Sequence, residues 1–279
     1  SQASLFVNTY FDFFEKISMH ETVDEDFLKI IYDKFPDTFI YEELRRFIYE
    51  LKSVYGENYK YNQFLNHILW LGSSHYQIKY SLDTSISERV IFPISDTEKN
   101  GIEDARFLKF DYGNGRSIYY ATYTAFDGIS IMPKLLSTKD FITFKIQPIY
   151  GKIANKGAAL FPKKINGRYA MLCRVDGENN YISFSDDIGN WQEEVILLNE
   201  PRYAWEFIQL GNCGSPIETS KGWIVLTHSV GPMRQYTISA ILLDLKEPTK
   251  IIGSLKEPIL YPDDEEREGY VPNVVYSCG

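Results

Sequence analysis

The stretch GIEDARFLKFDYGNGRSIYYATYTAFDG, residues 101–128, carries the pattern that decides the fold. Two runs rich in aromatic and β-branched residues flank the turn-forming residues 111–115, so the stretch predicts a β-hairpin. Further copies begin near Asn155 and Gly211, and a shorter copy begins near Glu268. Each full copy predicts a strand, a turn and a second strand that ends in a polar residue. The chain therefore contains a repeated hairpin.

The spacing of the copies indicates the architecture. Equivalent places in the four copies are held by Ala105, Ala159, Ser215 and Pro272, which lie 54, 56 and 57 residues apart. A period of about 50 residues built from hairpins is typical of β-propeller blades, which bring equivalent edges to a common axis. The sequence has room for about four blades. We therefore expect an all-β propeller whose last copy ends after its first strand. Either neighbouring segments close the ring, or, as we favour, the propeller is incomplete in this chain.

The N-terminal part of the chain has a different pattern. Residues 9–55 show helical periodicity, with apolar side chains such as Phe27 and Ile31 on one stripe. We expect a helical N-terminal segment over residues 1–66 and a β-propeller catalytic domain over residues 67–279, with the C-terminal strand missing. The helical segment is expected to pack on the β domain as an appendage. An interface of a homo-oligomer is the alternative.

Composition excludes several classes of partner. The net charge is −9 and no Lys/Arg-rich run offsets it, so we expect no nucleic-acid binding. No apolar run reaches the roughly 18 residues of a membrane span, so no membrane partner is expected. The three cysteines, Cys173, Cys213 and Cys278, form no CxxC pair, which favours free thiols in a reducing compartment and a cytoplasmic location. Aromatic residues make up 15% of the chain and suit the packing of sugar faces.

Three charged residues cluster at the start of the first hairpin. Glu103, Asp104 and Arg106 precede an apolar strand, where buried charges are costly unless paired. One interpretation is a structural Asp–Arg pair that fixes a blade edge. The other is a general acid, Asp104, whose pKa must be raised for it to protonate a glycosidic oxygen near neutral pH.

Basic residues occur at corresponding places in the later copies. Lys156 opens the second copy, Arg174 ends its second strand, and His228 ends the second strand of the third copy. If the blades converge, these side chains could hold a dianionic phosphate through charge-assisted hydrogen bonds. The alternative is that they satisfy backbone groups at the axis.

Other site classes find little support. Asn212 lies between two glycines, which allow a tight turn or a close approach to a ligand, but no dinucleotide-type strand and helix flank it. The histidines are scattered without metal-ligand spacing, so no metal is expected. Several aromatic residues are candidates either for sugar stacking or for the core: Tyr123, Phe126, Trp205, Tyr236 and Tyr270.

Together these motifs resemble glycoside hydrolase family 130, the β-mannoside phosphorylases and β-mannosidases. The resemblance rests on GIEDAR (101–106), NKGAALFPKKINGRYAMLCR (155–174), GNCGSPIETSKGWIVLTHSVG (211–231) and EGYVPNVVYSCG (268–279). Their order and spacing agree over roughly residues 88–279. The resemblance implies a five-bladed β-propeller, with residues 1–66 outside the common core.

The resemblance also implies the roles of individual residues. Asp104 matches the family's catalytic acid, which relays its proton through the 3-hydroxyl of the bound mannose. The implied phosphate ligands are Lys156, Arg174, His228 and Tyr236. The residues expected to contact the sugar are Glu103, Arg106, Tyr123, Asp127, Asn212 and Glu268. One position departs from the pattern: Gln209 stands where many phosphorylases carry a lysine.

These observations predict an inverting glycoside phosphorylase that cleaves a β-linked manno-oligosaccharide with inorganic phosphate and gives α-mannose 1-phosphate. Inorganic phosphate would be a co-substrate, and no organic cofactor is implied. One alternative is an inverting β-mannosidase that uses water, with Glu206 or Glu268 as the base. The other is a non-catalytic glycan-binding propeller.

Overall fold

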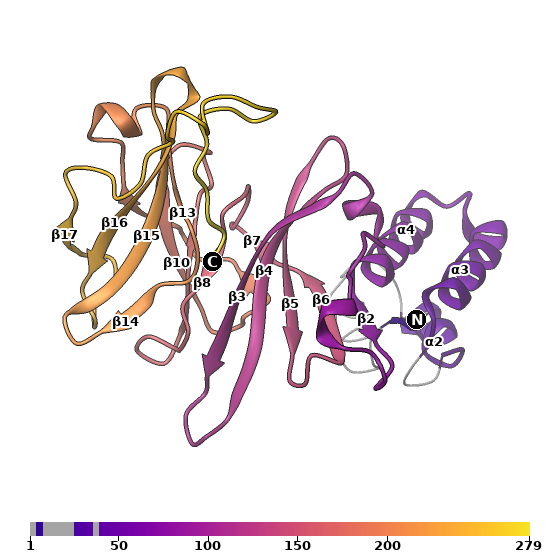
Figure 1. Cartoon of the computed structure of the whole chain (residues 1–279). Coiled ribbons are helices and arrows are strands. Elements are labelled where there is room, and N and C mark those ends of the chain that lie inside the picture. Colours follow the sequence, from indigo (N-terminus) through magenta and orange to yellow (C-terminus); the bar gives the residue numbers. More distant parts are fainter. Residues whose placement is uncertain (1–3, 8–24, 36–38) are drawn as a thin grey trace. The chain divides into compact units, whose positions relative to one another are not determined.

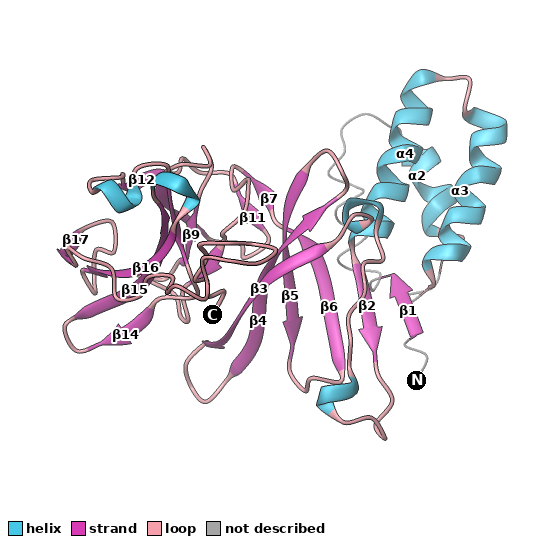
Figure 2. Cartoon of the chain, turned by 45° about the horizontal axis from the view of Figure 1, so that its top comes forward, coloured by secondary structure: helices cyan, strands magenta, loops and turns pink. Residues whose placement is uncertain are grey.

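The computed structural model describes residues 4–7, 25–35 and 39–279 and divides into two compact units (Figure 1). Unit 1 comprises residues 1–100 and 137–147, and unit 2 comprises residues 101–136 and 148–279. Strands form most of the regular structure, and all α-helices of the described part of the chain lie in unit 1 (Figure 2). The mostly β character predicted from the sequence is therefore confirmed.

Unit 1 is built around three helices, α2 (Glu25–Tyr32), α3 (Tyr41–Tyr55) and α4 (Tyr59–Ser74). α4 begins where the side chain of Asn58 accepts a hydrogen bond from the backbone N–H of Lys60 at 3.0 Å, which satisfies a free donor of the first turn. Of the helical periodicity expected over residues 9–55, α2 and α3 confirm the parts at residues 25–32 and 41–55. Residues 8–24 and 36–38 lie outside the described part of the chain.

α3 and α4 pack side by side through apolar stripes (Figure 1). Leu44 and Ile48 of α3 and Leu65 of α4 are fully buried. Gly72 allows the close approach, because a Cβ atom there would overlap the side chain of Leu44. α4 continues beyond His67, where the sequence pattern predicted a change to strands, because its apolar stripe continues to the end of the helix.

Unit 1 also contains a small antiparallel sheet. β2 (Tyr76–Lys79) follows α4 directly and pairs with β1 (Ser4–Val7) on one side and β6 (Thr143–Pro148) on the other. Two short 3-10 helices, η1 (Ile86–Glu88) and η2 (Asp96–Glu98), lie in the segment that leads to unit 2. Capping boxes close both of them, which satisfies the backbone donors at their starts.

Unit 2 contains three antiparallel sheets with the same strand order: in each, the strands lie side by side in the order in which they follow along the chain. The first is formed by β3 (Ile102–Asp111), β4 (Ser117–Phe126) and β5 (Ile131–Thr138), which belong to a six-stranded sheet with the order β1-β2-β6-β5-β4-β3. The second contains β8 (Ala159–Leu160), β9 (Tyr169–Cys173), β10 (Asn180–Ser185) and β12 (Ile196–Asn199). The third contains β13 (Gln209–Asn212), β15 (Gly222–Val230), β16 (Tyr236–Leu243) and β17 (Ile251–Ser254), with β14 (Ile217–Thr219) also paired to β15.

The second strands of the predicted hairpins are confirmed. The sequence predicts these strands over residues 117–126, 169–175 and 223–230. β4 has the predicted bounds, and β9 and β15 begin within one residue of the predicted starts. The prediction for the fourth copy was wrong, because the structure assigns no strand within residues 262–279, all of which it describes. A strand requires a ladder of partners, and this copy has single backbone contacts such as the bond from Tyr236 N to Asn273 O at 2.8 Å.

The second sheet has buried side chains on both faces, which explains why every residue of β9 is buried. Met171 and Tyr169 lie in a core that includes Phe110 of the first sheet. Leu172 lies in a second core that includes Trp223 of the third sheet. The three sheets therefore pack face to face in chain order.

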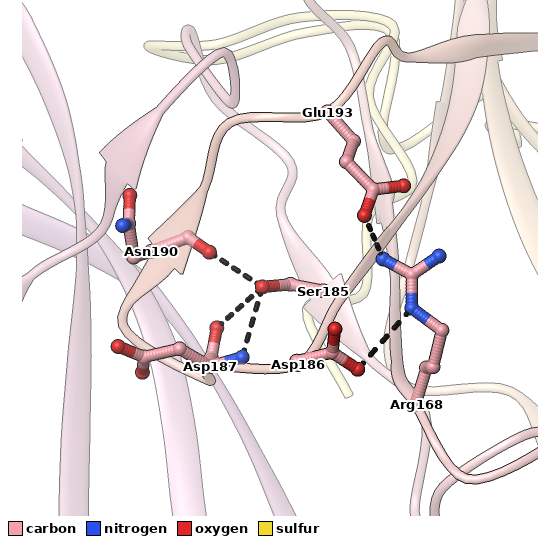
Figure 3. Close-up of polar contacts among 6 residues, drawn as sticks. All are labelled: Arg168, Ser185, Asp186, Asp187, Asn190 and Glu193. Carbon is pink, nitrogen blue, oxygen red and sulfur yellow. Dashed lines mark hydrogen bonds and ion pairs between the residues drawn. The ribbon is translucent and has the colours of Figure 1, made fainter.

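A polar network fixes the loop after β10, at the point where β11 (Asn190–Trp191) pairs in parallel with β7 (Tyr150–Gly151). The Ser185 hydroxyl lies within hydrogen-bond distance of the carbonyls of Asp187 and Asn190 (Figure 3). Arg168 forms two ion pairs with carboxylates of the same region (Figure 3). This cluster is structural, since none of its members lines the pocket described next.

Candidate functional site

Unit 2 contains a pocket of about 140 Å³ whose lining comes from all three sheets and from the C-terminal segment. The lining residues are Glu103, Asp104, Arg106, Lys156, Gly157, Arg174, Gln209, His228, Tyr236 and Tyr276. The acid, the proposed phosphate ligands and two of the predicted sugar-contacting residues therefore share one cavity. Segments more than 170 residues apart in sequence meet there.

Asp104 enters the pocket from a β-bulge. The register between β3 and β4 shifts between Glu103 and Arg106, so two residues of β3 oppose one residue of β4. Asp104 adopts a left-handed backbone conformation with φ of 56°. Asp and Asn tolerate this conformation better than most residues, and its cost is of order 1 kcal/mol. The bulge therefore turns a carboxylate out of the regular alternation of the strand.

Arg106 is buried beneath the pocket and connects the sheets. Its Nε donates to the carbonyl of Cys213, its Nη1 donates to the carbonyl of Ala158 at 3.3 Å, and its Nη2 donates to the Tyr276 hydroxyl at 3.2 Å. No direct Asp104–Arg106 ion pair occurs in the described part of the chain. Arg106 therefore has a structural role, as one interpretation of the sequence expected. Its partners are backbone carbonyls and the Tyr276 hydroxyl, and not the carboxylate of Asp104.

Lys156 does not stand alone in the pocket. Its ammonium group forms an ion pair with Glu103, and both side chains are about half exposed. An exposed pair of this kind contributes at most about 1 kcal/mol, so an entering anion could compete with Glu103 for Lys156. The positive charge of Lys156, which we expected to bind phosphate, is therefore partly neutralised in the free pocket.

Arg174 follows β9 and has unsatisfied donors. Its side chain is 8% exposed, and its Nε and Nη1 atoms are buried without a hydrogen-bond partner within residues 4–7, 25–35 and 39–279. Burial lowers the pKa of the guanidinium from its usual value, and the neighbouring Arg106 charge also lowers it. A buried cation with free N–H groups is costly. An anionic ligand in the pocket would remove that cost.

His228 lies on β15 and is neutral at physiological pH. Burial, followed by the charges of Arg174 and Arg106, lowers the pKa of its imidazole to about 3. The sequence counted it among the cations, and this part of the interpretation was wrong for the free pocket. A neutral imidazole carries one N–H donor, so His228 can still donate a hydrogen bond to a phosphate oxygen. Its ring stacks on Tyr236 with an interplanar angle of 16°.

Gly211 makes room for this imidazole. It faces His228 across the β13–β15 ladder, and a Cβ atom at Gly211 would overlap the ring. We expect Gly211→Ala to displace His228, to destabilise unit 2 by about 1–3 kcal/mol through overpacking and to weaken phosphate binding. Thermal denaturation and phosphate titration measure the two effects. Gly253→Ala is the matched control, since its Cβ would meet nothing closer than 3.6 Å; equal effects at both sites would contradict the prediction.

Several residues that the sequence assigned to sugar binding do not line the pocket. Asp127 caps a turn and accepts hydrogen bonds from backbone groups that follow it. Tyr123 is 6% exposed and belongs to the buried part of β4. Asn212 is 1% exposed, next to Gly211 on β13, and Glu268 lies in an exposed turn. Neighbouring residues on a strand face opposite sides, so Asn212 faces away from the side that carries Gly211.

The candidate bases of the hydrolase alternative are also outside the pocket. Glu206 is buried, but its Oε2 accepts hydrogen bonds from the backbone N–H groups of Arg202 and Tyr203 and so caps the helix η3 (Ala204–Glu206). Of the stacking candidates, Tyr236 lines the pocket, whereas Trp205 stacks on Tyr203. Tyr270 is fully exposed, and Phe126 lies at the exposed end of β4.

Sequence reasoning did not single out Tyr276 and Gly157. Gly157 adopts φ of 91° beside Arg106, a conformation that favours glycine. Tyr276 lies in the shortest copy, where no strand pattern points to a function.

Two further properties of the described residues bear on the class of protein. Their helices include none that combines the length and apolar character of a membrane span. The same residues contain no group of three or more His, Cys, Asp or Glu side chains arranged to hold a metal ion.

Comparisons with known proteins identify the family of the chain. The family model described as β-1,4-mannooligosaccharide phosphorylase, of glycoside hydrolase family 130, matches residues 41–279. A 1,2-β-oligomannan phosphorylase of Thermoanaerobacter sp. (strain X514) is 40% identical over 191 residues, which are 66% of this chain and 62% of that protein. A β-1,2-mannobiose phosphorylase of the same organism is 38% identical over 64% of this chain and 59% of its own length.

A solved structure is also similar. The β-1,2-mannobiose phosphorylase from Listeria innocua, in complex with β-1,2-mannobiose, superposes with a TM-score of 0.59 at 28% identity. The match covers 74% of this chain and 57% of that chain. The present chain thus spans less than two thirds of the length of these relatives.

Proposed function

Because the chain belongs to glycoside hydrolase family 130, we propose that its protein cleaves β-mannosides with inorganic phosphate and inverts the anomeric centre to give α-mannose 1-phosphate. The observation that carries this proposal is the buried Arg174, whose free N–H groups and neutral neighbour His228 share a pocket with Asp104. A water molecule needs no such cation, whereas a phosphate dianion does.

The proposed mechanism divides the pocket into two sides. Asp104 supplies the proton that the leaving sugar oxygen gains, directly or through a hydroxyl of the substrate. Phosphate attacks the anomeric carbon from the opposite face, held by Arg174 and by the N–H of His228, with Tyr236 and Lys156 at its edge. No protein base is required, because the attacking group is already an anion. This division also explains why Glu206 and Glu268 lie outside the pocket.

The finer fold belongs to the same proposal. We propose that the three sheets of unit 2 are consecutive blades of a five-bladed propeller. The support is their common strand order, their face-to-face packing and the bonds from Arg106 of β3 to carbonyls that flank the first strands of the other two sheets. The helical segment over residues 1–66, the homo-oligomeric state and the cytoplasmic location stay predictions of the sequence.

The names of the relatives guide the choice of substrate. The two Thermoanaerobacter proteins and the Listeria protein are named for β-1,2-linked mannosides, and a 36% identical relative from Ruminococcus albus is named for β-1,4-linked mannooligosaccharides. We propose a β-1,2-linked mannoside as the preferred substrate.

Phosphate dependence tests the proposed function. We expect the intact protein to release α-mannose 1-phosphate from β-1,2-mannobiose only when phosphate is present, at a rate that saturates with phosphate. β-1,4-mannobiose, assayed in parallel, tests the linkage. Release of free mannose without phosphate would identify a hydrolase, and sugar binding without turnover of either substrate would identify a glycan-binding protein.

A further inference from the structure

The hydroxyl group of Tyr276 touches the proposed acid. It donates a hydrogen bond to Oδ2 of Asp104 at 2.8 Å, and it accepts one from Nη2 of Arg106 at 3.2 Å. A contact between these residues, 172 positions apart in sequence, brings the C-terminal segment against the bulge of β3.

The direction of these bonds is fixed by chemistry. A guanidinium group only donates, so the Tyr276 oxygen must be the acceptor toward Arg106. A phenol has one proton, and toward the Asp104 carboxylate, which only accepts, it is the donor. Oδ2 is therefore occupied as an acceptor, which favours Oδ1 as the oxygen of Asp104 that carries a proton.

The phenol itself is held firmly. Arg106 is anchored to the carbonyls of Ala158, directly before β8, and of Cys213, directly after β13. The Tyr276 ring also packs against the imidazole of His228, with the centroids 4.9 Å apart and the planes inclined by 57°. Burial raises the pKa of Tyr276 above its ordinary value, so the phenol keeps its proton as a donor over the physiological range.

We propose that Tyr276 is a positioning residue for the acid: it holds Oδ2 of Asp104 and leaves Oδ1 as the oxygen that delivers the proton. This inference rests on the proposed function of Asp104. Arg106 acts one step further away, because it orients the phenol and forms no ion pair with the Asp104 carboxylate in the described part of the chain. The left-handed backbone at Asp104 gives the side chain a direction, and Tyr276 selects the oxygen.

Other charged or titratable groups share the pocket and bear on any pH effect. They are Glu103 and Arg106 on the same strand, Lys156 and Arg174 from the second sheet, and His228 and Tyr236 from the third. Removing one atom, the hydroxyl oxygen of Tyr276, abolishes its hydrogen bond to Asp104. A hydrogen bond to the ionised form of an acid stabilises that form, so loss of the hydroxyl should change the pH dependence of turnover.

The test is Tyr276→Phe in the intact protein, with phosphate-dependent cleavage of β-1,2-mannobiose followed across pH. We expect kcat to fall about 10- to 100-fold, since a hydrogen bond to a charged group is lost, with the KM for phosphate unchanged within about twofold. The basic limb of the kcat/KM profile should move to higher pH by up to about one unit. A purely structural tyrosine would leave this limb in place. Tyr261→Phe, at an exposed position outside the pocket, should match the wild type.

The outcomes separate the two proposals. A Tyr276→Phe protein with wild-type kcat and an unmoved basic limb overturns the assignment of Tyr276, provided that Asp104→Asn is inactive. Phosphate-dependent turnover by Asp104→Asn would instead overturn the proposed function. If Tyr276→Phe does not fold, 3,5-difluorotyrosine at position 276 keeps the shape and donates more strongly. The basic limb should then move to lower pH, and an unmoved limb would reject the inference.

Discussion

Asp104→Asn is expected to lower phosphate-dependent cleavage of β-mannosides by about 10³-fold, within the range that a general acid contributes. An amide has no proton of suitable acidity to give to the leaving sugar oxygen, so the loss should appear in kcat. The KM for phosphate should change little, because Arg174 and His228 are untouched. Release of α-mannose 1-phosphate measures the effect.

Asparagine is the right replacement because of the backbone. Asp104 has φ of 56°, and Asn accepts this conformation about as readily as Asp, whereas most other side chains would add strain of about 1–2 kcal/mol. The amide can also accept the hydrogen bond from Tyr276. The variant therefore removes the acid and keeps the bulge, so its melting temperature should stay near that of the wild type.

Asp264→Asn provides the matched control. Asp264 is almost fully exposed and forms a surface ion pair with Arg267, so the same chemical change there should leave turnover and stability unaltered. If Asp104→Asn keeps more than about a tenth of the wild-type rate, Asp104 is not the acid, because even a weak general acid contributes more than that.

The sequence predicted the strands well because local rules set them. Turn residues at 111–115 and alternating apolar runs require no distant partner, and β4 has the predicted bounds. The end of the helical region was harder to place. The buried stripe of α4 continues past His67, and the strand that follows also contains apolar residues, so the sequence shows no clear boundary between them. The fourth copy was predicted wrongly for another reason. A strand there would require a partner strand to pair with, and the sequence pattern of the copy does not show whether one is present.

The site was predictable in position more than in detail. The repeat correctly brought Asp104, Arg174 and His228 to one cavity. It did not reveal that burial keeps His228 neutral, nor that Glu103 neutralises Lys156. Those properties depend on the distances between segments, which a spacing argument does not contain.

Asn212 shows how sensitive such assignments are to one residue. Successive side chains on a strand face opposite sides, so a shift by one position exchanges a pocket residue for a buried one. On β13 the pocket side belongs to Gln209 and to Gly211, which faces His228. The glycines around Asn212 were therefore the informative residues, and Gly211 serves the imidazole.

Arg174→Met should change stability and phosphate binding in opposite directions. The buried guanidinium has two atoms without partners in the described part of the chain, and replacing a poorly satisfied buried charge by an apolar side chain of similar length often stabilises a protein by about 1–4 kcal/mol. We therefore expect a higher melting temperature without phosphate. Binding should weaken at least about 100-fold, since two charge-assisted hydrogen bonds are lost.

Thermal denaturation with and without phosphate measures both effects on the same protein. Phosphate should raise the melting temperature of the wild type, because a ligand that binds only the folded state stabilises it, and should leave that of Arg174→Met unchanged. Removing the Arg174 charge should also raise the pKa of His228 from its present value of about 3, since burial would then be the main remaining cause. Arg116→Met, at an exposed turn, should keep the phosphate response. A marked loss of stability in Arg174→Met would show instead that the arginine is a structural residue, and an undiminished response to phosphate would place the anion elsewhere.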